Sequence, residues 1–169
     1  MRILLFTIFV LISVLANAQD LKYGFAGGLL SGSERNEFNG NTGTVSDSGF
    51  YIGFFTEIPI TEKFKIQPEF DYGNIGGSGY AFLSARAKYY ALKSFYLQAG
   101  PQLTYVLQDV AGFLNKAGAD LSFGAGFDFS EHFHFQARYA FEITNRLNQG
   151  NSGDSSRLNW LQVGVGYSF

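Results

Sequence analysis

The last stretch of the sequence, WLQVGVGYSF, alternates between apolar and other residues. Leu161, Val163, Val165, Tyr167 and Phe169 occupy every second position. Because successive side chains of a β-strand point to opposite faces, this period of two predicts a strand with one apolar face. Seven further segments alternate in the same way, and they lie at residues 21–30, 49–59, 64–72, 80–90, 95–107, 119–129 and 133–143. Strands of roughly ten residues have the length that crosses a membrane at a tilt.

The connections between these segments alternate in length. Long polar segments are expected at residues 31–48, 73–79, 108–116 and 145–156, and short turns at 60–63, 91–94 and 130–132. Long loops on one side and short periplasmic turns on the other are typical of outer-membrane β-barrels. The sequence therefore predicts an all-β fold, an eight-stranded antiparallel up-and-down transmembrane β-barrel with both termini on the periplasmic side.

The N-terminus has the pattern of a secretory signal peptide. Arg2 precedes an apolar run over residues 3–16, and the small residues Ala16 and Ala18 stand just before Gln19. This run is shorter than the roughly 20 apolar residues of a membrane-spanning helix, so we expect cleavage before Gln19. Residues 1–18 are then the signal peptide, and residues 19–169 form one barrel domain in the cell outer membrane.

The bulk of the apolar side chains predicts which face of the barrel points outward. The interior of an eight-stranded barrel is only just wide enough to be filled by side chains, and the apolar face is too bulky for it. The opposite face carries many glycines, among them Gly24, Gly126 and Gly166, which relieve crowding in a narrow lumen. A charge that faces lipid costs about 2–4 kcal/mol at the midplane, and the apolar face carries none. We therefore expect this face to contact lipid, unlike the inward apolar face of a soluble lipocalin-like barrel.

The face opposite the apolar one carries charges of both signs in near balance. They are Lys22, Lys65, Arg86, Lys88 and Arg138 against Glu57, Glu69, Asp71, Asp120, Asp128 and Glu142. An unpaired charge in such a poorly solvated space is costly, so we expect pairing across the lumen. The predicted lumen charge network consists of Lys65, Glu69, Asp71, Arg86, Lys88, Asp120, Asp128, Arg138 and Glu142, and it closes the barrel as a polar plug.

Two longer stretches resemble a known family. Residues 49–73, GFYIGFFTEIPITEKFKIQPEFDYG, and residues 89–107, YYALKSFYLQAGPQLTYVL, are similar to the PorT-like outer-membrane β-barrel family. The matching positions are Glu57, Pro59, Lys63, Gln67, Pro68, Glu69, Gly100 and Pro101. The terminal Phe169, preceded by Tyr167 and Val165, is similar to the assembly signal that the barrel-assembly machinery reads. The resemblance implies an outer-membrane barrel and, for some members, a role in protein secretion.

The sequence does not favour catalysis, cofactor binding or nucleic-acid binding. The formal net charge is only −2. The only histidines, His132 and His134, fall at a short turn, away from the outer rim where barrel enzymes usually carry their sites. Two residues apart on a strand, they would share a face about 7 Å apart. Two ligands are fewer than a metal site usually needs, so we expect turn and lumen polar residues here.

Two functions from different classes remain open. The first is a structural or interaction protein that stabilises the outer membrane or presents its loops, such as the polar segment 33–38, to a partner. The second is a small transport pore for ions or solutes. The expected partners are outer-membrane lipid, the barrel-assembly machinery during biogenesis, and an envelope or secretion protein.

Overall fold

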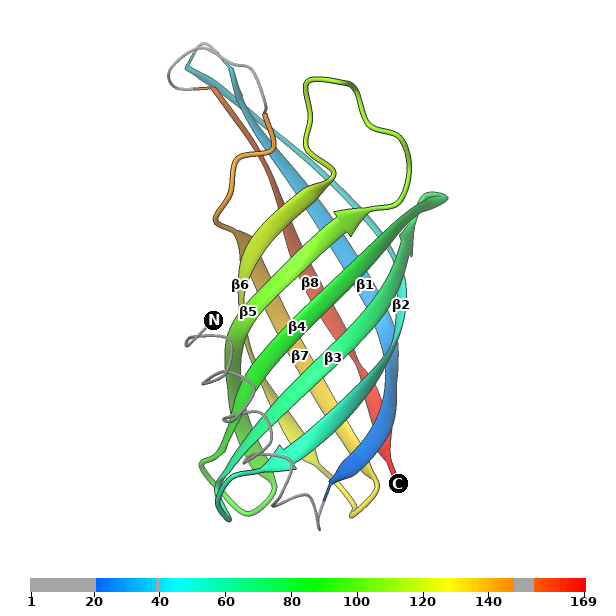
Figure 1. The fold of residues 1–169 in the computed structure, drawn as a ribbon, viewed down its shortest axis with the longest axis vertical. Helices are drawn as coiled ribbons and strands as arrows, with labels where there is room; N and C mark the ends of the chain where they lie inside the picture. The colour runs from blue at the N-terminus through cyan, green and yellow to red at the C-terminus, as the bar shows by residue number, and fades with distance from the viewer. Residues whose placement is uncertain (1–20, 39, 148–153) are drawn as a thin grey trace, which may run out of the picture.

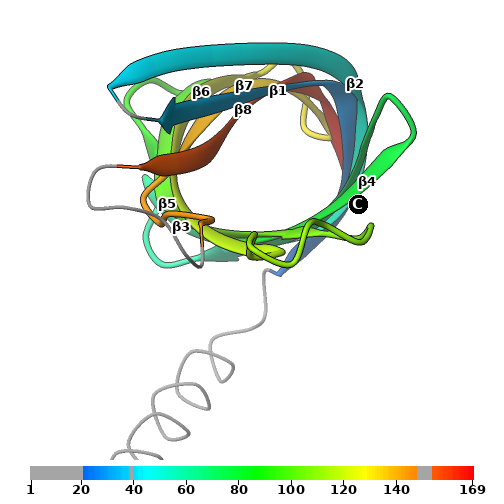
Figure 2. The same cartoon turned by 90° about the horizontal axis from the view of Figure 1, so that it is seen from above.

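The computed structural model describes residues 21–38, 40–147 and 154–169, which form a closed β-barrel (Figure 1, Figure 2). Eight antiparallel strands follow one another around the barrel in chain order, and β8 pairs with β1 to close it. The strands are β1 (Lys22–Phe38), β2 (Asn41–Pro59), β3 (Phe64–Ile75), β4 (Ser78–Tyr90), β5 (Phe95–Val106), β6 (Ala117–Asp128), β7 (Phe133–Glu142) and β8 (Ser155–Ser168). The predicted eight-stranded all-β barrel is confirmed.

The predicted signal peptide and its cleavage residues Ala16, Ala18 and Gln19 lie outside the described residues. The domain boundary after residue 18 therefore stays a prediction. Within the described ranges, no helix is long and apolar enough to span a membrane.

The two ends of the barrel differ in their connections. At one end, which we call the turn end, short turns at 60–63, 91–94 and 129–132 join the strands, and the C-terminus lies there too (Figure 1). At the other end, which we call the loop end, residues 107–116 join β5 to β6 and residues 143–154 join β7 to β8.

Two connections at the loop end differ from the sequence prediction. Most of the segment 31–48, expected to be a long polar loop, continues β1 and β2 as a hairpin. Likewise, β3 and β4 are joined only by Gly76 and Gly77. These glycines have φ angles of 57° and 86°, the left-handed values that a tight two-residue hairpin turn requires. Ser, Thr, Asn and Gly are common in loops. The polar parts of β1 and β2 that extend beyond the barrel wall therefore resembled a loop in sequence.

Three strands rise beyond the rest of the barrel at the loop end. Residues 31–38 of β1 pair with residues 41–48 of β2, and β8 pairs with β1 as far as Ser155. We call these parts of the three strands the projecting sheet, and Figure 1 shows it above the barrel wall.

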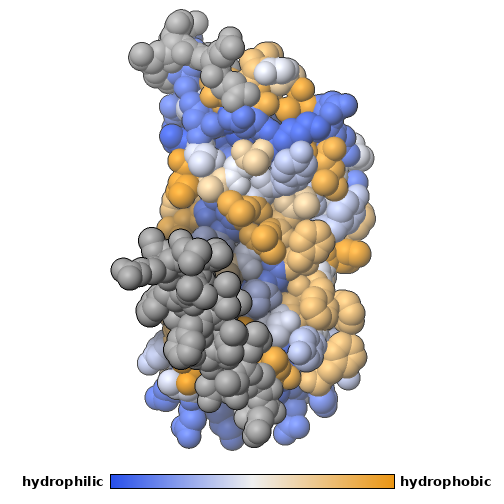
Figure 3. Space-filling model, viewed as in Figure 1, coloured by the Kyte–Doolittle hydropathy of each residue, from blue (hydrophilic) through white to orange (hydrophobic). Residues whose placement is uncertain are grey.

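Large apolar side chains cover the outer wall between the two ends. Exposed examples come from every strand, and they include Phe25, Phe50, Ile52, Phe70, Leu83, Leu97, Leu103, Phe123, Phe135, Leu161 and Val165. In the view of Figure 3, this apolar band lies between more polar ends. The apolar face of the strands therefore points outward, as predicted.

Glycines on the inner wall make room for large inward side chains of neighbouring strands. The Phe55 ring lies against Gly24, and the His134 imidazole lies against Gly166. A methyl group at either glycine would overlap the facing ring. Close packing of ring on glycine thus fits aromatic side chains into a narrow lumen.

An apolar cluster also occupies part of the lumen, and the sequence analysis did not predict it. This aromatic cluster consists of Ala26, Leu30, Tyr51, Phe55, Ile75, Phe82, Ala140 and Trp160. Trp160 is 1% exposed, and its ring lies edge-on to Tyr80 and Phe82 at centroid distances of 4.8 and 5.1 Å. Trp160 faces the lumen and the next residue, Leu161, faces outward. Both faces of β8 are therefore apolar at this point, and the sequence no longer alternates between apolar and polar residues.

Candidate functional site

Charged side chains from three strands meet in the lumen and form what we call the central cluster. Arg138 on β7 contacts two carboxylates of β3, with Nη1 2.7 Å from Glu69 Oε1 and Nη2 3.2 Å from Asp71 Oδ2. Arg86 on β4 pairs with the other oxygen of Glu69. Gln67 Nε2 also donates to this oxygen, at 2.6 Å. Each of these side chains is at most 2% exposed. Because β3 and β7 are not neighbours in the sheet, the Arg138 contacts cross the lumen.

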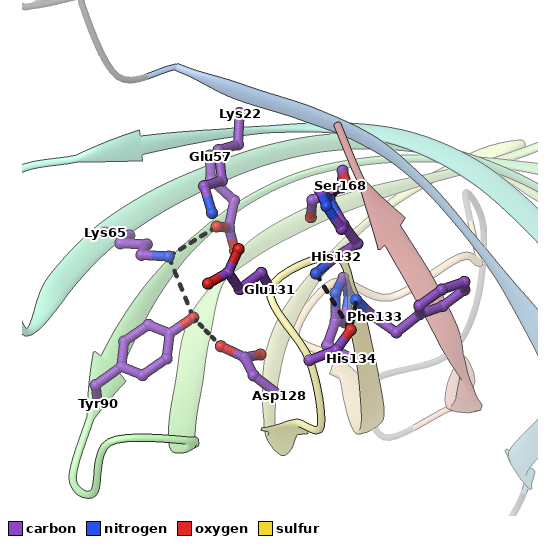
Figure 4. A pocket seen from close by; sticks show the side chains of 11 residues that line it. Lys22, Glu57, Lys65, Tyr90, Asp128, Glu131, His132, Phe133, His134 and Ser168 are labelled. Carbon is purple, nitrogen blue, oxygen red and sulfur yellow. Dashed lines mark hydrogen bonds and ion pairs between the residues drawn. The ribbon is translucent and has the colours of Figure 1, made fainter.

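A second group of polar side chains, the turn-end cluster, lies near the mouth at the turn end (Figure 4). Glu57 pairs with Lys88 through one oxygen and with Lys65 through the other, at 2.9 Å. Lys65 Nζ also donates to the Tyr90 hydroxyl at 3.3 Å, and this hydroxyl donates to Asp128 Oδ2 at 2.9 Å. A cavity of about 30 Å³ lies beside Glu57, Lys65, Tyr90 and Asp128, and it has room for a water molecule.

A third group, the loop-end cluster, lies toward the opposite mouth. Asp120 accepts hydrogen bonds from Gln102 Nε2 at 3.0 Å and from the Thr104 hydroxyl. Arg146 Nε lies 2.9 Å from Glu142 Oε1, and its Nη1 donates to the Lys116 carbonyl at 3.0 Å. A cavity of about 140 Å³ opens beside Arg146, and its other lining residues are Glu34, Tyr80, Val106, Val110, Leu114, Asn115, Ser156 and Leu158.

The β5–β6 loop carries an exposed ion pair. Lys116 Nζ lies 2.7 Å from Asp109 Oδ1. This hydrogen bond lowers the pKa of the Asp109 carboxyl and raises the pKa of the Lys116 amino group. Such exposed pairs contribute little to stability because water and salt screen them.

The nine predicted network residues all lie in these three clusters, but they do not form a single chain of ion pairs. Asp120 and Asp128 are held by hydrogen bonds from neutral groups. Lys22, which the sequence placed on the inward face, is exposed at the turn end. Arg146 was missed because it follows β7 in a segment that resembled a loop. Arg146 follows Glu142 by four residues, and this spacing is too common in sequences to identify the two residues as an ion pair.

The two histidines both line the turn-end cavity, but their surroundings differ. His134 is buried in the lumen against the Phe55 ring. His132 precedes β7 and stacks on the ring of the outward Tyr167, with its Nδ1 2.9 Å from the Ser168 carbonyl oxygen. His132 lies in the turn before β7 and is exposed, whereas His134 lies within β7 and is buried. Among the described residues, no group of three or more His, Cys, Asp and Glu side chains could hold a metal ion.

Several buried polar atoms in the lumen have no hydrogen-bond partner among the described residues. They include Arg86 Nε, Arg138 Nε and Asp71 Oδ1. Buried groups of this kind are normally satisfied by ordered water. The three clusters can therefore hold isolated water molecules, and the ion pairs of the central cluster connect opposite walls of the barrel.

The residues of the predicted assembly signal lie at the junction of the first and last strands. The Phe169 N–H donates to the Tyr23 carbonyl at 2.8 Å. The Phe169 ring lies edge-on to Phe25 and Tyr167, at centroid distances of 5.9 and 5.3 Å. Val165 is exposed on the same outer face. The end of β8 is thus held to β1 by a backbone bond and by ring contacts.

Solved structures of other proteins share this fold. Neisserial surface protein A is similar to this chain with 16% identity and a TM-score of 0.56, covering 89% of this chain and 100% of its own. Ail, the attachment invasion locus protein of Yersinia pestis, was solved with the heparin analogue sucrose octasulfate. It is similar with 15% identity, a TM-score of 0.50 and the same coverage. Neither a protein-family model nor a curated protein sequence matches this chain. The comparisons thus establish the fold, that of a small eight-stranded β-barrel.

Proposed function

We propose that this chain is an integral protein of the outer membrane, exported by a signal peptide that ends at Ala18. The apolar outer wall supports this proposal, since a wall of exposed residues such as Leu29 and Leu103 suits lipid and not water. Closure of the barrel supports it too, because every strand of the wall has a partner on both sides. The turn end then faces the periplasm, and the projecting sheet faces outward from the cell.

The proposed role is structural or interactive, without transport or catalysis. One observation carries the inference that the barrel does not transport solutes: Arg138 bridges the lumen to Glu69 and Asp71, and all three side chains are buried. The aromatic cluster fills the lumen beside it. Breaking a buried ion pair costs about 3–5 kcal/mol, so an open path through the centre is unfavourable. Aqueous channels occur in barrels of about 16 strands, twice the number here.

The proposed partners follow from this location. Outer-membrane lipid contacts the wall, and the barrel-assembly machinery reads Val165, Tyr167 and Phe169 during insertion. An envelope or secretion protein contacts the loop end. Membership of the PorT-like family, which motivates the secretion role, stays a prediction because it rests on the sequence resemblance alone.

Planar-bilayer recording on the purified folded protein tests the closed lumen. We expect no reproducible conductance steps from the wild-type protein, while a 16-stranded porin in the same apparatus serves as the positive control. An Arg86→Ala variant is expected to unfold at lower temperature. Stable conductance steps from the wild-type protein would contradict the closed lumen and favour a transport pore.

Labelling of intact cells tests the location and orientation. A tag inserted after Gly112 in the β5–β6 loop is expected to react with an impermeant reagent in intact cells. A matched tag in the 91–94 turn should react only after the cells are permeabilised. Equal labelling of both tags in intact cells would be inconsistent with the proposed orientation.

A further inference from the structure

Where β2 belongs to the projecting sheet, its outer edge has no strand partner among the described residues. This strand pairs with β1 as far as Asn41, but its pairing with β3 ends at Gly49. Residues 41–48 therefore pair on one side only, as far as the structure describes the chain. The β8 edge of the same sheet is covered, because Ser156 accepts a hydrogen bond from the Arg146 N–H and donates its own N–H to Asn145 Oδ1, both at 3.0 Å.

This open edge lacks the features that normally prevent strand addition. Proteins protect sheet edges with Lys, Pro or bulges, whereas residues 41–48 read NTGTVSDS. All of these residues are exposed, and the pairing with β1 is continuous along them. Thr42, Thr44 and Val45 are β-branched and hold the segment in an extended conformation. The edge is therefore a preformed template for main-chain hydrogen bonds from another strand.

The segment 41–48 itself carries a negative charge, and the neighbouring Arg35, opposite Thr44 on β1, is already paired with Glu37. Asp47 is the only charged residue in the segment 41–48. It lies opposite Gly32 in the pairing of β1 with β2, so strand alternation places it on the same face of the sheet as Glu34. Glu34 accepts hydrogen bonds from Asn36 and Ser156, and neither Glu34 nor Asp47 forms an ion pair with any described residue. Because Arg146 lines the same cavity as Glu34, Asp47 is the carboxylate that attracts a basic partner to this edge.

We propose that residues 41–48 bind an extended basic segment of another protein, which adds to the projecting sheet as a further strand beside β2. This inference rests on the proposed function and specifies the partner's chemistry. Eight residues offer an edge of roughly 27 Å at 3.4 Å per residue. Main-chain bonds supply affinity, and basic side chains near Asp47 supply selectivity. A second copy fits poorly, because residues 41–48 contain no basic residue that could meet the Asp47 carboxylate of the first copy.

Peptide binding to the folded full-length barrel in detergent micelles tests this proposal. The probe is a ten-residue peptide of alternating Thr and Val with two central Lys residues. One control peptide has the same side chains with N-methyl groups on alternate amides, so that it cannot donate main-chain hydrogen bonds. Asp47→Lys is the test variant, and Asp109→Lys is its matched control, since Asp109 is an exposed acidic residue of the loop end outside the projecting sheet.

We expect saturable binding of the first peptide and none of the N-methylated one. Asp47→Lys should weaken binding about tenfold, because an attraction is replaced by a repulsion, while Asp109→Lys should leave it unchanged. Amide exchange should slow over residues 41–48 and not over residues 107–116. No binding up to millimolar peptide, equal binding of both peptides, or slowing confined to the loop would overturn the inference. Bilayer recording reports separately on the closed lumen, so a silent barrel that binds no peptide refutes this inference alone.

Discussion

Arg138 on β7 and Glu69 on β3 contact each other across the lumen, with a distance of 2.7 Å between Nη1 and Oε1. Both side chains are at most 2% exposed, and their strands lie on opposite walls of the barrel. Arg86 pairs with the second carboxylate oxygen of Glu69, and Asp71 pairs with the second terminal nitrogen of Arg138. At this level two paired side chains therefore span the lumen between opposite walls.

Removing the Arg138 side chain should destabilise the barrel strongly. Arg138→Ala leaves Glu69 and Asp71 buried without their shared cation, and breaking a buried pair costs about 3–5 kcal/mol. Urea unfolding in detergent micelles measures the change in the free energy of unfolding. The control is Arg35→Ala, which removes the exposed Arg35–Glu37 pair and should cost about 1 kcal/mol or less. Equal losses in the two variants would show that the lumen pair is not structural.

The single tryptophan provides an optical test of the aromatic cluster. Because Trp160 is 1% exposed inside the lumen, its fluorescence should resist quenching both by acrylamide and by brominated lipid. A Trp160→Phe/Phe123→Trp variant moves the indole to the outer wall, where Phe123 is 49% exposed. Brominated lipid should quench this variant strongly. Strong quenching of the wild-type protein by the same lipid would place Trp160 on the lipid face and contradict the strand register.

Because His134 packs on Gly166, a side chain added at position 166 should lower the stability, and removal of the His134 ring should restore part of it. In Gly166→Ala the new methyl group overlaps only the His134 ring, and overpacking of this kind costs about 1–3 kcal/mol. Adding His134→Ala removes the overlap, so the double variant should regain part of the lost stability. Gly112→Ala is the control, because no atom of residues 21–38, 40–147 or 154–169 lies within 4 Å of its added methyl group. Thermal unfolding measures all three, and additive losses in the double variant would argue against this packing.

Deletion of Phe169 should impair insertion more than it impairs stability. The terminal residue makes one backbone hydrogen bond and two ring contacts on the outer face, so the folded barrel loses little without it. If the assembly machinery reads this residue, the amount of protein in outer-membrane fractions should fall severalfold. Phe113→Ala, which truncates an exposed aromatic residue of the β5–β6 loop, serves as the control. Equal amounts of both variants in the membrane would refute an assembly role for Phe169.

The alternation of residue types was enough to predict the eight strands and the outward apolar face. This works because a strand has a side-chain period of two, and because lipid requires one face to be apolar throughout. Strand alternation also placed Glu69, Asp71, Arg86 and Arg138 in the lumen, since each stands between outward apolar residues. The sequence by itself therefore determined the class of fold and most of the buried charges, although it missed Arg146 and placed the exposed Lys22 among them.

Only the tertiary structure decided which buried charges meet. Arg138 contacts Glu69 from 69 residues away along the chain, and this pairing depends on the stagger of all the strands between β3 and β7. The continuation of β1 and β2 through residues 31–48 was equally hidden, because pairing between two polar strands leaves no apolar period to read. The aromatic cluster escaped prediction for a related reason. Trp160 and Leu161 are adjacent and both apolar but face opposite sides of the wall, so the alternation between apolar and polar residues is lost there. The local sequence pattern thus predicts whether a side chain faces lipid or the lumen. Which side chain it contacts across the lumen depends on how the barrel closes.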